Sequence, residues 1–521
     1  MTYSLILTSG IIGISMCLTG FKINKYGRDS ISEWWYCFYM MIGIPILMAT
    51  LIPQFMLKSI TLILAGIFPF TVFTVLIESS VGFVYNKLEN KSGGPAGRIS
   101  KGYQDPDHLL TLNQKVNKGS FHIFIAVYLD NEIDIIESTL ESYTKLEYGK
   151  GKKNDKITVE IIYNTSVNVS TETIATMLYI KNKWHNKTIG SCLFKIVHNT
   201  KSSSKAENIN FGLETLISDT LNTKDDNFDL PDYIGVFDAD HQIDSMAVMH
   251  ASQLFREGSD IIQGHCTVRN YADSLITSIV AIEFEDLYNL GQEGRCHLYD
   301  LALFSGSVGF WRSSILMNIK FDGSIMTEDI DSSFRATETS ANVTYCHSIK
   351  STELATETFK SLLNQRQRWG QGWLQTSKKH LYNAIYSSKA INYKIGVILL
   401  LFWCEIYPYF TFTPIIFLII AYIRNINLFT SFNFIIFLYC PLFMNLLRMT
   451  MLALVADGPI TMNKRWSTYF LFYYNISLMY QGLLNIIKVS SHWREIIKKK
   501  EWIVTSRGSF TTSVSACLLA K

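Results

Sequence analysis

Two blocks of long apolar segments bracket a central stretch of the chain that has none. Each block holds segments near the roughly 20 residues that cross a hydrocarbon core. The N-terminal block has three such segments, at 3–21, 35–57 and 60–85. The C-terminal block has four, at 395–409, 412–423, 432–455 and 469–487. Because 412–423 is short and shares a break between Pro408 and Pro414 with the segment before it, three spans remain an alternative there.

Composition agrees with a membrane protein that carries one folded domain. The 521 residues are 48% hydrophobic and only 17% charged, which is apolar for a globular chain. The formal net charge of +3 gives no argument for nucleic-acid binding, and no nucleic-acid partner is expected. The nine cysteines stand singly without a CxxC pair, so we expect reduced residues and neither a zinc site nor a disulfide framework.

The positive residues predict an orientation. Lysines and arginines follow the first and third apolar segments, whereas the link between the second and third offers only Lys58. Positive residues concentrate on the cytoplasmic side, so the central domain is predicted in the cytoplasm. We expect a multi-pass protein of the plasma membrane or Golgi. The predicted divisions are N-terminal spans at 1–86, a linker at 87–119, a central domain at 120–351, interfacial helices at 352–390, C-terminal spans at 391–489 and a cytoplasmic tail at 490–521.

The central stretch alternates strand-like and helix-like runs. The strand-like runs are 121–128, 157–163, 192–198 and 233–237. The helix-like runs between them are 133–148, 171–184 and 209–218. Such alternation predicts an α/β domain with a doubly wound, mostly parallel sheet, whose ligands bind at the carboxyl ends of the strands.

An acidic pair stands at one of those strand ends. Asp238 and Asp240 in the segment FDADH follow the run 233–237. Two carboxylates at this spacing can share Mg²⁺ or Mn²⁺ with the phosphates of a nucleotide. An isolated pair of this kind is more often a turn or a helix cap, so the metal site depends on the motifs that accompany it.

A second acidic segment, TEDID at 327–331, supplies a candidate general base. Asp329 can remove a proton from an acceptor hydroxyl if Thr327 and Glu328 hold it in place. The alternative is a helix N-terminus with Thr327 as cap and acids in the first turn. The two interpretations are compatible.

The segment QRQRW at 365–369 follows. On a helix Gln365, Arg368 and Trp369 share one face, with Arg366 turned away. A guanidinium fork matches a diphosphate, and an indole suits the apolar face of a sugar ring. The alternative is an amphipathic helix at the membrane interface.

Together with KAENIN at 205–210 and FSGSVGFWR at 304–312, these segments resemble, in order and spacing, the membrane-embedded family 2 inverting glycosyltransferases. That family includes cellulose, chitin, hyaluronan and mannan synthases. The resemblance implies a cytoplasmic GT-A domain on a bundle of membrane helices, with Asp329 as the base. It implies metal ligation by Asp240 and Asp238. The donor would be held by Lys205, Asn210, Asp238, Gln365, Arg368 and Asn164. The acceptor site would be lined by Trp369, Glu328, Ser305, Gly306 and Trp311.

Two departures from the family pattern stand out. The first strand runs into Tyr128-Leu129-Asp130 where the family has a proline before Tyr-Asn-Glu. The second strand ends at Asn164 where the family has an aspartate near the nucleotide base, so the donor, normally a UDP-sugar, is less constrained than the reaction.

The sequence therefore predicts inverting, metal-dependent transfer of a sugar from a nucleotide donor to a growing β-linked polysaccharide, coupled to its translocation. The alternatives are single addition to a lipid acceptor, such as ceramide or polyprenyl phosphate, and a catalytically silent membrane scaffold. The expected partners are the donor, a polysaccharide or lipid acceptor and the bilayer. No oligomeric state is predicted.

Overall fold

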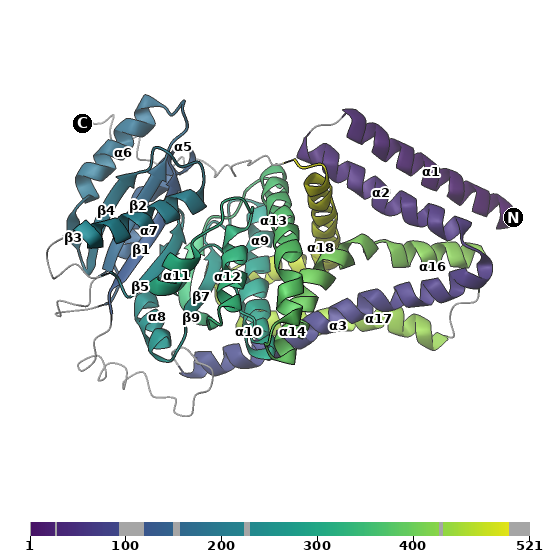
Figure 1. Ribbon diagram of the computed structural model, residues 1–521. Coiled ribbons are helices and arrows are strands. Elements are labelled where there is room, and N and C mark those ends of the chain that lie inside the picture. The colour runs from purple at the N-terminus through teal and green to yellow at the C-terminus, as the bar shows by residue number, and fades with distance from the viewer. Residues whose placement is uncertain are drawn as a thin grey trace.

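A nine-stranded sheet forms the centre of the domain between the two blocks of apolar helices (Figure 1). The computed structural model describes residues 2–26, 29–92, 119–148, 157–222, 230–426 and 431–499. The strand order is β3-β4-β2-β1-β5-β8-β7-β9-β6. Most of the proposed linker, at 93–118, and the tail from residue 500 lie outside the described residues.

The first half of the sheet is the parallel part. Its strands are β1 (Phe121–Tyr128), β2 (Ile157–Asn164), β4 (Cys192–His198) and β5 (Tyr233–Asp238). Neighbours β4, β2, β1 and β5 all pair in parallel. β1, β2 and β5 are buried on both faces, which explains their nearly unbroken apolar runs.

Sequence patterns missed the edge strand β3 (Lys187–Ile189), which pairs antiparallel with β4, and every strand of the second half of the sheet. The strands of that half are β6 (Gln242–Ile243), β7 (Ile261–Val268), β8 (Gly309–Arg312) and β9 (Val343–Glu353). β8 lies antiparallel between β5 and β7, whereas β7 and β9 are parallel. The predicted class of fold, an α/β domain with a mostly parallel sheet, is confirmed.

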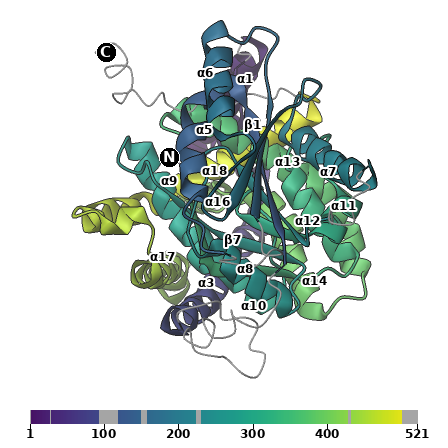
Figure 2. The ribbon, with the colours of Figure 1, turned by 90° about the vertical axis from the view of Figure 1, so that its left-hand side faces the viewer.

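Helices cover both faces of this sheet. The helices of this domain are α5 (Leu129–Tyr143), α6 (Thr171–Trp184), α7 (Lys205–Asn222), α8 (Ala247–Arg256), α9 (Leu275–Asp286), α10 (Glu293–Tyr299), α11 (Ser313–Ile319) and α12 (Glu328–Glu338). Figure 2 shows α5 and α6 on one side of the sheet and α7, α11 and α12 on the other. α6 begins after Ser170, whose side chain caps the backbone of Thr173 at 3.0 Å.

Long apolar helices extend away from the sheet (Figure 1). The N-terminal ones are α1 (Thr2–Tyr26), α2 (Ser30–Leu51) and α3 (Gln54–Ser92). Four helices among the described residues are long and apolar enough to cross a membrane: Ser4–Lys25, Ser30–Leu51, Gln54–Leu88 and Ile391–Ile423. They include all three predicted N-terminal segments.

The C-terminal block differs from the predicted four spans. The segments 395–409 and 412–423 form one candidate span, which has π-helical turns at Ile398–Trp403, a 3₁₀ turn at Tyr407–Phe410 and then α16 (Thr413–Ile423). Helix α17 (Ser431–Val455) contributes a shorter apolar helix, Tyr439–Val455. Helix α18 (Trp466–Ile496) is long enough but not apolar enough, because Tyr, Asn and Gln interrupt its apolar residues.

The segment QRQRW lies within α13 (Phe359–Tyr386), one continuous helix of 28 residues. Figure 1 shows α13 between the sheet and the apolar helices. The helix packs against α18, and Gln367 lies in the contact. Its side chain donates to Ser490 Oγ at 2.9 Å and accepts from Arg494 at 3.0 Å. Gln371 continues this contact one turn later by donating to Glu495 at 2.9 Å. A ladder of glutamines thus joins this domain to the apolar helices.

Candidate active site

Lys205 links three segments at the carboxyl end of the parallel strands. It opens α7, and its ammonium donates to Asp238 Oδ1 at 2.5 Å, where β5 ends. The same ammonium donates to the carbonyl of Gly306. The sequence predictions for Lys205, Asp238 and Gly306 therefore fall on residues that the fold brings into contact.

The loop at 304–308 is clamped against the end of β5. Gln263 on β7 is fully buried; its side chain accepts from the Ser305 amide at 2.7 Å and donates to the Ser307 carbonyl at 3.0 Å. Ser307 Oγ in turn accepts from the Asp238 amide at 3.0 Å. Gly306 sits within this loop at φ +95°, a conformation that glycine adopts without strain.

Asp329 lies against that glycine. A Cβ built on Gly306 would stand 2.7 Å from Asp329 Oδ2, so the carboxylate packs directly on the loop. Glu328 and Asp329 open α12, and Glu328 is 8% exposed. Thr327 precedes them without a side-chain cap, so the predicted capping role is absent.

Burial favours the protonated form of this acidic pair. Burial, followed by the neighbouring Asp329 carboxylate, raises the pKa of Glu328 to about 7. Burial also raises the pKa of Asp329, although Lys205 and Arg368 act in the opposite direction. Burial disfavours the Lys205 ammonium, but the carboxylates of Asp238 and the pair outweigh it and raise the pKa of Lys205. A carboxylate with a raised pKa beside two cations has the properties of a general base.

Arg368 reaches the pair because α13 packs closely on the TED segment. A Cβ built on Gly372 would stand 2.7 Å from the Thr327 backbone nitrogen. Gln375 Oε1 accepts from the Met326 amide at 3.0 Å, which extends the contact. Arg368 lies one turn before Gly372 and so on the same side of the helix. Its charge lowers the pKa of Glu328 and of Asp329.

Trp369 and Arg366 form a separate contact. The Arg366 guanidinium lies 4.4 Å from the centre of the Trp369 ring and pairs with Glu283 on α9 at 2.8 Å. Arg366 thus points to Glu283, but it contacts Trp369, from whose face of the helix the sequence predicted that it is turned away. It also covers one face of the indole, so a sugar would have to use the other face or the edge. Gln365 is half-buried on the same helix.

Asp240 is held under the end of β5. It is 2% exposed, and its Oδ2 accepts from the Leu354 amide at 3.0 Å, just beyond β9. Asp238 is more open, with a side chain 33% exposed. Two carboxylates, one of them reachable from solvent, form a hard oxygen donor set that fits Mg²⁺ or Mn²⁺. These residues are therefore compatible with the predicted cation.

Asn164 lies at the end of β2, as predicted, and has an unpredicted partner. Its Oδ1 accepts from Asn208 Nδ2 at 2.8 Å, and both residues are buried. The two asparagines form an uncharged amide pair next to the end of β1. An amide can both donate and accept, so the pair suits the polar edge of a nucleobase.

Two sequence predictions differ from the observed positions. Asn210 was predicted to hold the donor, but its side-chain amide is engaged by the backbone of Phe321, donating to the carbonyl at 2.8 Å and accepting from the amide at 2.9 Å. Trp311 has no exposed surface and packs between Phe304 and Phe321 in the core, which leaves no contact for an acceptor. Both residues support the loop.

Several residues of the site had no signal that distinguished them in the sequence. Gln263 looks like any polar residue in an apolar strand, and Asn208 differs from Asn210 only by its position on α7. Asp331, the last acid of TEDID, is fully buried and joins α12 to α13 through His380 Nε2 at 2.8 Å and Lys379 Nζ at 2.7 Å. A buried polar residue inside an apolar run was the available signal for Gln263.

Comparisons with known proteins find similarity to glycosyltransferases. A model of the family described as glycosyl transferase family group 2 matches residues 233–480. A probable glucomannan 4-β-mannosyltransferase 11 of Oryza sativa subsp. japonica is 21% identical over 56% of this chain and 46% of its own length. A poly-β-1,6-N-acetyl-D-glucosamine synthase of Staphylococcus epidermidis is 24% identical over 54% of this chain and 60% of its own length.

Among solved structures, the mannosyltransferase PcManGT from Pyrobaculum calidifontis, in complex with GDP-Man and Mn²⁺, is similar at 12% identity and a TM-score of 0.47. The similarity covers 83% of this chain and 100% of that one. The chain thus spans about half the length of the curated relatives that it matches. The family match and the mostly parallel sheet confirm the predicted resemblance and the glycosyltransferase fold of GT-A type.

Proposed function

Because residues 233–480 form a domain of glycosyltransferase family group 2, we propose that this chain transfers a sugar from a nucleotide donor to a growing β-linked polysaccharide. The names of the two relatives, a glucomannan mannosyltransferase and a poly-N-acetylglucosamine synthase, support this class of product. The observation that carries the proposal is the contact of Asp329 with Gly306, next to Lys205 and Arg368.

Asp329 is the proposed base. The acceptor hydroxyl gives its proton to the Asp329 carboxylate while its oxygen bonds to the anomeric carbon of the donor sugar. The bond between that carbon and the diphosphate breaks on the opposite side, so the configuration inverts. The raised pKa of Asp329 supports this role, because a base works best when its pKa lies near the working pH.

The departing diphosphate needs positive charge. Arg368 is the proposed diphosphate ligand, with Gln365 on the same face of α13 and Lys205 at the end of β5. Asp238 and Asp240 would hold Mg²⁺ or Mn²⁺, which when bound offsets negative charge on the diphosphate. Ser305, Gly306 and the uncovered face of Trp369 would line the acceptor site.

The donor base would meet the amide pair of Asn164 and Asn208. A neutral amide pair can bond the carbonyl and imino groups of uracil, and those of guanine as well, so a UDP-sugar and a GDP-sugar are both candidates. The donor panel described below separates the two.

Long apolar helices support insertion in a membrane. The lysines and arginines after the first and third segments favour a cytoplasmic catalytic domain, in the plasma membrane or the Golgi. We propose the domain divisions given above, with the polymer leaving through the helices that adjoin α13.

The test is transfer by the purified full-length chain in lipid nanodiscs. Labelled UDP-glucose, UDP-N-acetylglucosamine and GDP-mannose would each be supplied with Mg²⁺ or Mn²⁺. We expect one donor to yield a large polar product, and Asp329→Asn to lower the rate about 10²- to 10⁴-fold. Asp322→Asn, in an exposed loop, is the matched control.

Unchanged turnover in Asp329→Asn would remove the assignment of the base. A product found only in the chloroform phase would show that the chain makes a glycolipid and not a polymer. Absence of transfer with every donor and cation would favour the silent scaffold.

A further inference from the structure

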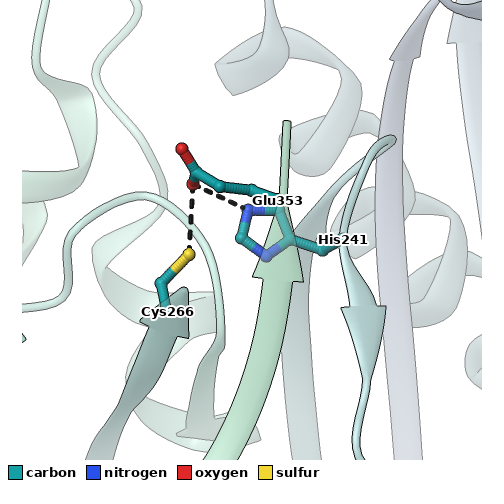
Figure 3. A group of neighbouring side chains, drawn as sticks. All are labelled: His241, Cys266 and Glu353. Atoms are coloured by element: carbon teal, nitrogen blue, oxygen red, sulfur yellow. Dashed lines mark hydrogen bonds and ion pairs between the residues drawn. The ribbon is translucent and has the colours of Figure 1, made fainter. Parts of the chain in front are cut away.

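Three side chains of different chemistry meet next to the turn that follows β5 (Figure 3). His241 follows β5, Cys266 lies on β7 and Glu353 ends β9. Glu353 Oε2 lies 3.4 Å from His241 Nε2 and 3.2 Å from Cys266 Sγ. All the potential ligand atoms lie within 4.8 Å of one another, and His241 and Cys266 are each 1% exposed.

The hydrogen bonds on the far side of the imidazole indicate its tautomer. The Ser351 hydroxyl donates to the Gln242 carbonyl at 3.0 Å, so it can only accept from His241 Nδ1, at 3.1 Å. A neutral His241 then carries its lone pair on Nε2, which faces a carboxylate oxygen of Glu353. Two facing lone pairs repel each other, so either a proton on Nε2 or a bound cation must lie between them. Metal-binding histidines are held in the same way, by a bond from the other ring nitrogen.

The spacing suits a tetrahedral ion of the size of zinc. With usual zinc–ligand lengths, a tetrahedral site puts nitrogen and oxygen ligands roughly 3.4 Å apart and sulfur and oxygen about 3.6 Å apart. The corresponding distances here are 3.4 Å and 3.2 Å. Small side-chain rotations therefore separate the present arrangement from a coordinated one.

Three carboxylates surround the cysteine, and one guanidinium lies nearby, that of Arg269, which donates to the carbonyls of Asp240 and Thr352. The carboxylates of Glu353, Asp240 and Asp238 all act electrostatically on the Cys266 thiol. In the absence of a cation the thiol keeps its proton and donates it to Glu353. A buried negative environment attracts a cation, and a bound metal displaces the proton of a coordinating thiol.

We propose that His241, Cys266 and Glu353 form a site for a zinc-class divalent cation that ties the turn carrying Asp240 to the ends of β7 and β9. Sulfur and imidazole ligands select borderline cations, whereas Mg²⁺ prefers oxygen ligands. The site is thus chemically distinct from the oxygen donors of Asp238 and Asp240. It contains one cysteine only, which is why cysteine spacing does not predict it. The inference is independent of the sugar that the chain transfers.

A second trio in the described part of the chain has a positive charge paired with its carboxylate. His265, His347 and Asp457 also lie within reach of a common ion. There, however, the Lys350 ammonium already pairs with Asp457, and His347 Nε2 lies 3.0 Å from the same carboxylate. A divalent cation would face a positive charge at that carboxylate, so the argument applies to the first trio.

The test measures the metal itself. The full-length chain, purified without a polyhistidine tag, is expected to retain about one zinc per chain. After removal of zinc with a chelator, Co²⁺ should produce a thiolate-to-cobalt charge-transfer band in the near ultraviolet. Zn²⁺ should abolish that band and excess Mg²⁺ should not.

Matched variants locate the site. Cys266→Ser and Glu353→Gln should lose the retained zinc, and Cys266→Ser should also lose the cobalt band. Cys192→Ser is the control, because Cys192 is equally buried but donates to the Tyr143 carbonyl at 3.3 Å in another part of the sheet. A wild-type chain with no thiolate band would overturn the proposal even if the variants fail to fold. An unchanged band in Cys266→Ser would overturn it as well.

Discussion

Gly306 and Asp329 touch: a Cβ on Gly306 would lie 2.7 Å from Asp329 Oδ2. The contact joins the loop that Lys205 binds to the start of α12. Any side chain at 306 must therefore displace the carboxylate, and the position of the proposed base depends on a residue that has no side chain.

We predict that Gly306→Ala lowers the transfer rate about 10²-fold, because a displaced base loses its alignment with the acceptor. The variant also carries about 1–2 kcal/mol of backbone strain at φ +95°. Gly258→Ala is the control, since Gly258 has φ +101° but nothing within 4 Å of its Cβ position. Equal rate losses in the two variants would attribute the effect to strain alone.

The transfer rate should rise with pH through about pH 7, where the buried acidic pair loses its proton. Replacing Glu328 by Gln removes the neighbouring negative charge, so the pKa of Asp329 should fall and the rising limb of the pH profile should move to lower pH. A pH–rate profile of both proteins measures this. A rising limb at the same pH in both proteins would show that the acidic pair does not cause the pH dependence.

The same pair should affect stability with a definite sign. The pKa of Glu328 is raised from 4.5 to about 7, so the folded chain binds this proton more tightly than the unfolded one. Stability conferred by the proton is therefore present below pH 4.5 and lost as pH rises towards 7. The Tm of Glu328→Gln relative to that of the wild type should therefore increase between about pH 5 and about pH 8. Parallel Tm curves would contradict this.

Asp331→Asn should lower the Tm at neutral pH. Burial disfavours the charged form of Asp331 and so acts to raise its pKa. Hydrogen bonds from His380, Lys379 and Arg335 outweigh burial and lower the pKa to about 2. Compared with the ordinary 3.8, this corresponds to roughly 2 kcal/mol, present above pH 3.8 and lost as pH falls towards 2. Asp322→Asn removes a different, half-exposed partner of Lys379 and should change the Tm little. Similar losses in both variants would argue against the buried network.

Gln367→Leu should loosen the docking of α13 on α18. The change keeps the volume but removes the acceptor for Arg494 and the donor to Ser490, at a cost of about 1–3 kcal/mol. Thermal unfolding in nanodiscs measures it, with Lys378→Ala on the exposed side of the same helix as control. An unchanged Tm in Gln367→Leu would show that apolar packing alone holds the two helices.

Local patterns predicted the parallel half of the sheet well. The bounds predicted for β1, β4 and α6 are the observed ones, because strands with buried faces and a serine-capped helix leave clear marks in a single sequence. The strand β8 left no such mark in the sequence, since it is four residues long and exists only by pairing with β5 and β7. In the C-terminal block the described residues give one candidate span, and polar residues in α18 lower its hydropathy.

Within the site, the sequence identified residue types and the fold decided their partners. Asn208 and Asn210 are two positions apart on α7, so they face different sides of the helix: one meets Asn164 and the other Phe321. Trp311 was predicted to contact an acceptor and is a core residue. Neither outcome follows from spacing along the chain.

The sequence by itself determined an α/β domain between apolar helices and the acids and bases of its site, because periodicity and strand-end residues are local properties. Only the tertiary structure decided that Asp329 faces Gly306, that Arg368 reaches the acidic pair and that His241, Cys266 and Glu353 converge. These contacts join residues far apart in the chain. They arise from close backbone approach at Gly306 and Gly372 and from strand order, and neither leaves a periodic signal.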